Sequence, residues 1–354
     1  MRKHLFVLAY LPFLYCSCKP EMALNGKNQI TKINDQPVAA AARPTPTVVS
    51  YMTGDPADVA TATLGGLVLM GGSTDVDPAI AWMLNRSGGG DVVVIRASGA
   101  DGYNTYMYNM VNVNSVESII IDSREKASLP EVAQKIRNAE ALFIAGGDQW
   151  NYVNYWKNSP VEDAINFLIN TKHVTVGGTS AGLAILGSAY YNAQLGSVTS
   201  PQALGNPYYK TVTLGANDFI SVPYMQNTIT DSHYSQRDRQ GRHITFLARL
   251  LKDFAYTTAK GIGVDEETAV CIDENGMGKV YGINSAYFLQ NNSGAAETCV
   301  AKKPLNWVKN NQAIKNYKIT GSLIGNGTVN LTNWTFTGGS QNYYFVNNGV
   351  LNTN

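Results

Sequence analysis

The stretch HVTVGGTSAGLAILG, residues 173–187, joins a short apolar run to two glycines, a serine and a second apolar run. Val and Thr favour a buried strand, and the small residues that follow permit a sharp turn into a helix. Four similar units precede it, with strands LGGLVLMGG, DVVVIRAS, SVESIIID and EALFIAGG that start at residues 64, 91, 115 and 140. Continuous apolar strands alternating with helical patterns predict an α/β fold, a three-layer sandwich whose parallel sheet is covered on both faces.

The intervening segments carry the 3.6-residue periodicity of helices. We expect helices over Val76–Asn85, Tyr103–Val111, Pro130–Asn138 and Pro160–Asn170. Further along, residues 231–253 begin polar and become an amphipathic helix. The segment GIGVDEETAVCID, residues 261–273, is expected to form one strand.

The N-terminus has the pattern of an export signal. A basic start precedes an apolar stretch that is too short to span a bilayer, and the stretch ends in YCSCK, residues 15–19. We interpret residues 1–17 as a signal peptide of lipoprotein type and Cys18 as the lipidated residue. Residues 18–47 then form a tether rich in Asn, Ala and Pro. The protein is expected on a membrane face, periplasmic or at the cell surface, with a lipid anchor as its membrane contact, or else secreted.

Composition narrows the classes of function. The chain has 354 residues, 44% of them hydrophobic, and a formal net charge of +1, which suits a globular protein and predicts no nucleic-acid partner. Cys and His show no metal-ligand spacing, so neither a metal nor a cofactor is expected. Residues 48–300 are expected to hold the catalytic domain. Residues 301–354, rich in Asn, Thr, Gly and aromatics, form a small β appendage or add edge strands to the main sheet.

Ser180 lies in a G-T-S-A-G sequence between the predicted strand and helix. A strained turn at this position projects a serine hydroxyl from the sheet edge, as in a nucleophile elbow. The N–H of Ala181 then faces the same space and is a candidate donor to an oxyanion. The GGDQ turn after the preceding strand reaches the same edge, which makes the Gly147 N–H a second donor and Gln149 a substrate contact.

A serine nucleophile needs a base, and the chain has four histidines. One lies in the signal peptide, and His173 stands about 20 Å away at the far end of the strand. His243 falls within the amphipathic helix, which leaves His233 in a polar loop. An acid must orient the imidazole, and Asp265, Glu266 and Glu267 are all candidates at this point.

Three arginines follow His233, at positions 237, 239 and 242. Guanidinium groups bind carboxylates through paired hydrogen bonds, so Arg237, Arg239 and Arg242 predict an acidic group on the substrate.

Taken in order, GGDQ, GTSAG, DSHYSQRDRQGR and GIGVDEETA resemble the cyanophycinase and dipeptidase E family of serine peptidases, over about residues 64–289. The resemblance implies a fold similar to class I glutamine amidotransferases and a homodimer. It implies a Ser180–His233–Glu266 triad, with a β-aspartyl-arginine unit held by positions that correspond to Gln149, Asp231, Arg237, Arg239 and Arg242. Ser232 departs from the glutamine that cyanophycinases have before the histidine.

The predicted function is therefore a serine peptidase that hydrolyses β-aspartyl or other acidic peptides. Two alternatives use the same sequence features. A carboxylester hydrolase also uses G-x-S-x-G, although in α/β-hydrolases the acid precedes the histidine in the chain. A non-catalytic surface lipoprotein that binds peptide or glycan would use the fold as a scaffold.

Overall fold

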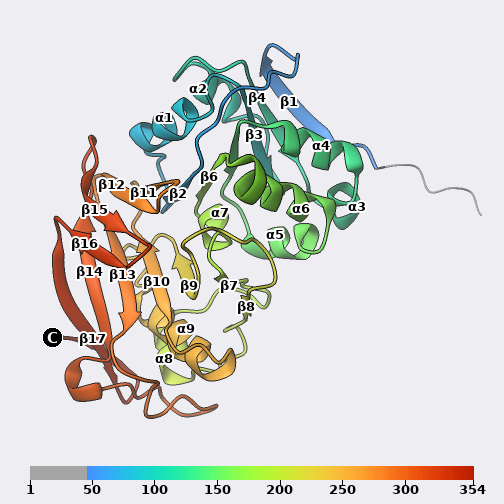
Figure 1. The fold of residues 1–354 in the computed structure, drawn as a ribbon. Coiled ribbons are helices and arrows are strands. Elements are labelled where there is room, and N and C mark those ends of the chain that lie inside the picture. Colours follow the sequence, from blue (N-terminus) through green and yellow to red (C-terminus); the bar gives the residue numbers. More distant parts are fainter. Residues whose placement is uncertain (1–45) are drawn as a thin grey trace, which may run out of the picture. The chain divides into compact units, whose positions relative to one another are not determined.

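The computed structural model describes residues 46–354, in which two β-sheets are flanked by helices (Figure 1). The predicted signal peptide, the lipidation site Cys18 and nearly all of the tether lie outside the described residues. Among the helices of residues 46–354, none combines the length and the apolar character that crossing a bilayer requires.

The first sheet has ten strands in the order β1-β4-β3-β5-β6-β2-β11-β12-β15-β16. Its centre is parallel from β4 to β2, whereas β1 and the strands from β11 onward run antiparallel to their neighbours. The α/β class with a central parallel sheet is thus confirmed. The strands are β1 Val49–Gly54, β2 Gly66–Met70, β3 Asp91–Arg96, β4 Ser115–Ile120, β5 Ala141–Ile144, β6 Thr175–Thr179, β11 Thr268–Asp273, β12 Met277–Gly282, β15 Asn326–Asn330 and β16 Thr335–Thr337.

Helices cover both faces of this sheet because successive side chains of each strand point to opposite sides. Val68 and Met70 pack in one core with helices α1 and α2, whereas Leu67 and Leu69 pack in another core with α4 to α7. The helices are α1 Asp77–Asn85, α2 Asn104–Tyr108, α3 Arg124–Ala127, α4 Pro130–Asn138, α5 Gln149–Trp156, α6 Pro160–Phe167 and α7 Ala181–Ala184, with a π-helical turn at Leu168–Lys172.

The second sheet has eight strands in the order β18-β17-β14-β13-β10-β9-β7-β8, and helices α8 and α9 pack on it. Its presence departs from the expectation of a single main sheet. Its elements are β7 Ala189–Tyr191, α8 Ser200–Gly205, β8 Leu214–Ala216, β9 Thr228–Asp231, α9 Gln240–Asp253, β10 Lys260–Val264, β13 Ser285–Asn291, β14 Ile314–Thr320, β17 Ser340–Asn347 and β18 Val350–Thr353.

The expectation of one strand over residues 261–273 is wrong. Strand β10 ends at Val264 in the eight-stranded sheet, and β11 begins at Thr268 in the ten-stranded sheet. The three acids occupy the crossing, where Glu267 has a φ of 55°. A run of carboxylates is costly within a buried strand, and here the chain leaves one sheet and enters the other at those residues.

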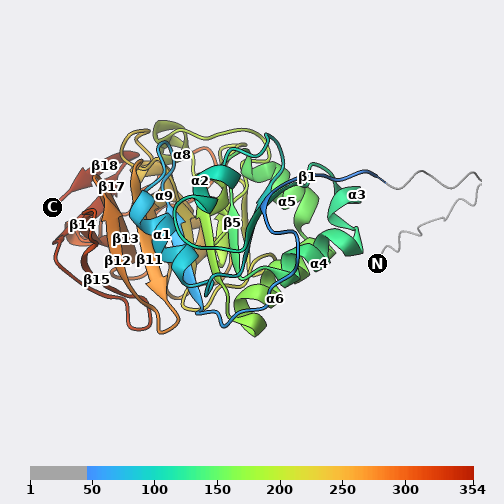
Figure 2. The ribbon, with the colours of Figure 1, turned by 90° about the horizontal axis from the view of Figure 1, so that it is seen from above.

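Residues 301–354 contribute strands to the outer ends of both sheets. Strands β14, β17 and β18 extend the eight-stranded sheet, and β15 and β16 extend the ten-stranded sheet. Figure 2 shows them at the end of the molecule opposite α3 and α4. Within residues 46–354, Cys271 and Cys299 are both buried and unpaired.

Candidate active site

Ser180 lies directly after β6 with φ 53° and ψ −110°, and α7 begins at the next residue. Its N–H donates to the carbonyl of Met70 over 3.0 Å, which fixes the turn against the neighbouring strand. The turn also depends on two glycines. A Cβ on Gly178 would lie 2.6 Å from the backbone of Gly182, and a Cβ on Gly182 would lie 2.1 Å from the Ile144 carbonyl oxygen. This is the strained strand-to-helix turn expected of an exposed nucleophile.

His233 reaches Ser180 from the loop that follows β9. Its Nε2 lies 2.7 Å from the Ser180 Oγ. The backbone of His233 has a φ of 46°, and its N–H donates to the carbonyl of Gly71 over 2.8 Å. The His233 side chain is only 8% exposed, so the imidazole ring is almost completely buried.

Glu266 contacts the other nitrogen of the same ring. The distance from Glu266 Oε1 to His233 Nδ1 is 2.6 Å. The neighbouring acids are used differently. The Asp265 carboxylate accepts from the N–H groups of Ser235 and Ser285, and the Glu267 N–H donates to the Gly72 carbonyl. The turn between β10 and β11 therefore presents Glu266 to the imidazole.

Burial lowers the pKa of His233 below its usual 6.5, and the nearby charges of Arg237 and Arg239 lower that pKa further, while Glu266 opposes the change. The lowered pKa therefore favours the neutral imidazole at pH 7. With Nδ1–H donating to Glu266, the free electron pair of Nε2 faces the Ser180 hydroxyl. A neutral imidazole in this tautomer can accept the serine proton.

The turn Gly71–Gly72 after β2 is a part of the site that was not predicted from the sequence. Gly72 has a φ of 99°, and a Cβ there would lie 2.6 Å from His233 Nε2 and 3.0 Å from Ser180 Cβ. The carbonyls of this turn also receive the His233 and Glu267 N–H groups. Its signal was a glycine pair directly after a buried parallel strand, at the edge where ligands gather.

The structure separates the three predicted arginines. Arg242 is 3% exposed and forms a two-point ion pair with Asp231, with Nε–Oδ2 at 2.8 Å and Nη2–Oδ1 at 2.6 Å. Its remaining terminal nitrogen, Nη1, bonds to Ser197 and Val198. The predicted substrate contacts at Arg242 and Asp231 are therefore not available in this arrangement, because each charge already neutralises the other in the interior.

Arg239 and Arg237 lie closer to solvent. The Arg239 guanidinium donates to the carbonyl and hydroxyl of Ser232, and its side chain is 15% exposed. Ser232 thus positions the Arg239 guanidinium by accepting hydrogen bonds through its carbonyl and hydroxyl oxygens. Arg237 is 53% exposed, and its Nε lies 3.6 Å from Glu266 Oε1. Of the three arginines, Arg237 is the one that faces solvent, beside Glu266.

The GGDQ turn lies beside Ser180 as the strand order requires. A Cβ on Gly146 would lie 3.5 Å from Ser180 Cβ, and Gly147 is exposed. Asp148 caps α5 by accepting from the Trp150 N–H, and the Gln149 Nε2 lies 3.5 Å from the Tyr191 carbonyl. Gly146 therefore lies next to Ser180, Ala181 follows Ser180 in the chain, and Gln149 is partly exposed at the start of α5.

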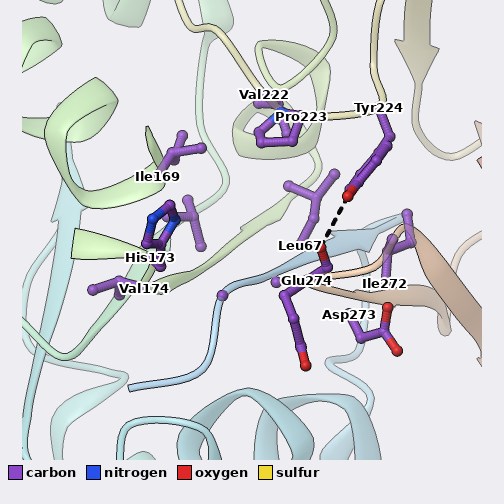
Figure 3. A pocket seen from close by; sticks show the side chains of 13 residues that line it. Leu67, Ile169, His173, Val174, Val222, Pro223, Tyr224, Ile272, Asp273 and Glu274 are labelled. Atoms are coloured by element: carbon purple, nitrogen blue, oxygen red, sulfur yellow. Dashed lines mark hydrogen bonds between the residues drawn. The ribbon is translucent and has the colours of Figure 1, made fainter. Parts of the chain in front are cut away.

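Two hollows mark opposite edges of the ten-stranded sheet. One follows the Gly71–Gly72 turn and is lined by polar residues that include Asp75, Asp77 and Arg96. The other, in Figure 3, lies at the amino ends of β2 and β6 and is mainly aliphatic. His173 lies in this second hollow, at the end of β6 opposite Ser180.

His243 lies in the interior of the protein, away from Ser180. It is fully buried, and its ring bonds to the Tyr234 hydroxyl and the Ile229 carbonyl, each over 3.2 Å. Burial lowers the pKa of His243 to about 4. Within residues 46–354, no group of three or more His, Cys, Asp or Glu side chains is arranged to hold a metal ion.

A model of peptidase family S51 matches residues 67–280. The cyanophycinase of Trichormus variabilis is 27% identical over 179 residues, which are 51% of this chain and 54% of that protein. The cyanophycinase of Synechococcus elongatus is 24% identical over 179 residues, 51% of this chain and 50% of that protein. The chain thus spans about half the length of the curated relatives it matches.

Two solved structures are similar at lower levels. A peptidase from an acI-B1 Actinobacterium has 15% identity and a TM-score of 0.46, covering 68% of this chain and 98% of its own. A putative peptidase E protein from Listeria monocytogenes has 17% identity and a TM-score of 0.42, covering 63% of this chain and 100% of its own. Because the family model matches more than half of its residues, this chain belongs to peptidase family S51.

Proposed function

We propose that this chain is a serine peptidase in which Ser180 is the nucleophile, His233 the general acid and base, and Glu266 the residue that orients the imidazole. The observation that carries the proposal is the continuous set of contacts from Ser180 Oγ to His233 Nε2 at 2.7 Å and from His233 Nδ1 to Glu266 at 2.6 Å. Membership of a peptidase family supports amide hydrolysis over ester hydrolysis.

The reaction would proceed through an acyl-enzyme. The Ser180 Oγ forms a bond to the amide carbonyl carbon while its proton passes to His233 Nε2. The C–N bond then breaks, and the leaving amine takes that proton from His233. Water then gives a proton to the same nitrogen and attacks the ester carbonyl carbon. The bond from that carbon to Ser180 Oγ breaks, the Oγ takes the proton back from His233, and the acid is released. The N–H groups of Ala181 and Gly147 would donate to the oxyanion.

The proposed substrate is a β-aspartyl or other acidic peptide. Arg237 supports this choice, because its charge is solvent-facing and lies next to Glu266. A β-aspartyl linkage leaves a free α-carboxylate beside the scissile amide, which a guanidinium can bind through two hydrogen bonds. The name cyanophycinase on the curated relatives is consistent with this class of bond.

The test compares hydrolysis of β-aspartyl dipeptides, cyanophycin and matched peptides with a neutral residue. We expect Ser180→Ala to abolish hydrolysis and Arg237→Gln to raise KM for the acidic peptides about tenfold, the loss of one charged hydrogen-bond partner. Unchanged hydrolysis by Ser180→Ala would overturn the mechanism. Equal rates on neutral and acidic peptides would overturn the substrate class alone.

A further inference from the structure

A groove with an aromatic floor lies between the β15–β16 hairpin and the eight-stranded sheet. Its lining residues fall between positions 288 and 341, beyond the part of the chain that the family model matches. Three half-buried rings, Tyr317, Trp334 and Phe336, line it together with the buried ring of Phe288. The triad, at the Ser180 edge, contributes no residue to its lining.

The rings are held in fixed positions. Phe336 stacks on Phe288 with centroids 4.5 Å apart and on Tyr317 at 5.6 Å, and Trp334 meets Phe336 edge-on at 5.4 Å. The Tyr317 hydroxyl accepts from the Gly339 N–H over 3.2 Å. Trp334 has a φ of 58°, a conformation that bulky residues rarely adopt. A rigid aromatic surface loses little entropy when a ligand binds to it.

Polar groups surround this floor on the same face of the sheet. Gln290 on β13 lies opposite Lys315 on β14, and Tyr317, two residues further along β14, lies opposite Gln341 on β17. Side chains two residues apart on a strand point to the same face of a sheet, so all four side chains share one face. Lys260 pairs with Gln290, and its Nζ lies 4.8 Å from the Trp334 ring centre.

The charge of the groove is positive. Among the residues that line it, no carboxylate occurs, and within residues 46–354 neither Lys260 nor Lys315 forms an ion pair with Asp or Glu. Two unneutralised ammonium groups beside an aromatic floor attract an anionic ligand.

We propose that this groove binds an oligosaccharide that carries carboxylate groups. The polarised C–H groups on one face of a sugar ring are attracted to the electron-rich face of an aromatic ring. The Gln290 and Gln341 amides each donate and accept, which suits vicinal hydroxyls, and the lysines suit carboxylates. A purely apolar segment would offer no partner to the Gln290 amide or to the Lys315 ammonium group as it excluded water.

The test uses Ser180→Ala protein, full chain, titrated calorimetrically with hexagalacturonate and with the neutral probes cellohexaose and maltohexaose. We expect binding of hexagalacturonate, with Trp334→Ala weakening it at least about tenfold, the effect typical of a central aromatic contact. Lys315→Gln should weaken it severalfold and lose the preference for the acidic probe. Tyr108→Ala, which truncates an exposed aromatic on α2, should leave binding unchanged.

Absence of binding to all three probes would overturn the proposal, as would equal binding of the acidic and neutral probes. If Trp334→Ala fails to fold, Trp334→Phe and Lys315→Gln carry the comparison, because both keep the floor filled. In the background that keeps Ser180, Trp334→Phe and Lys315→Gln should hydrolyse a short peptide at the parent rate. The proposal for the groove and the proposal for the peptidase site are thus tested independently of each other.

Discussion

The two edges of the central parallel sheet hold their polar residues in different ways. At the carboxyl edge, Ser180 has a positive φ outside the left-handed helical region, and no helix capping requires it. At the amino edge, His173 also has a positive φ, yet it ends the turn Leu168–Lys172, where a left-handed residue is ordinary. Strain that local capping does not explain therefore distinguishes the candidate active edge.

The edges differ in their cavities as well. The hollow around His173 is mainly aliphatic, and Glu274 at its rim already pairs with Arg86. The Ser180 edge combines a buried imidazole, a carboxylate and an exposed guanidinium within one set of contacts. In this protein, a set of connected polar groups therefore indicates the active site better than an apolar hollow does.

The largest expected effect comes from the two histidines. His233→Ala should lower kcat/KM by about 10⁴-fold or more, because the base and the serine act as a unit. His173→Ala, at the opposite end of β6, should leave kcat/KM unchanged. Steady-state kinetics on a β-aspartyl dipeptide, with circular dichroism to verify folding, would measure both. A comparable loss in His173→Ala would break the contrast between the edges.

The neighbouring acids give the next test. Glu266→Gln should lower kcat by about 10³- to 10⁴-fold, because an amide no longer selects the tautomer that accepts from Ser180. Glu267→Gln keeps the backbone bond to Gly72 and should change kcat less than about threefold, within the range of surface substitutions. Reversal of this order would show that the wrong acid has been assigned.

Two glycines sharpen the comparison further. Gly72→Ala places a methyl group against His233 and Ser180 at a φ of 99°, so we expect about 100-fold lower kcat and a cost of about 1–2 kcal/mol in unfolding free energy. Gly65→Ala at the amino edge meets its nearest atoms at 3.6 Å, an ordinary contact. Normal activity in Gly72→Ala would contradict the close approach on which the site depends.

The smallest effect concerns pH. The lowered pKa of His233 means that the neutral, active ring persists below pH 6.5, and kcat/KM should fall as pH drops through that pKa. Arg237→Gln removes a charge that lowers this pKa, so the acid limb should move to higher pH, and only slightly, since Arg237 is half exposed. Lys135→Gln, a similarly exposed cation elsewhere, should leave the profile in place.

The sequence predicted the features that depend on local pattern. The parallel strands, the glycine-flanked elbow at Ser180 and the elimination of His173 follow from periodicity and chain geometry. It could not choose among the acids at 265–267, because alternation assumes an unbroken strand and the chain there passes between sheets. The resemblance to a family, not the spacing, indicated Glu266.

The arginines illustrate a second limit. Spacing grouped Arg237, Arg239 and Arg242 as equivalent, whereas burial separates them, and the partner of Arg242 is known only once Asp231 lies beside it. Edge strand β1 and the second sheet were missed for a related reason, since their pairing joins residues far apart in the chain.

Covalent labelling tests the central claim most directly. A fluorophosphonate probe reacts with a serine whose proton is taken by a neighbouring base. Intact-protein mass spectrometry of the full chain should show one adduct, peptide mapping should place it on Ser180, and both Ser180→Ala and His233→Ala should lose it. An adduct on another residue, or full peptidase activity in protein that cannot be labelled at Ser180, would contradict the account.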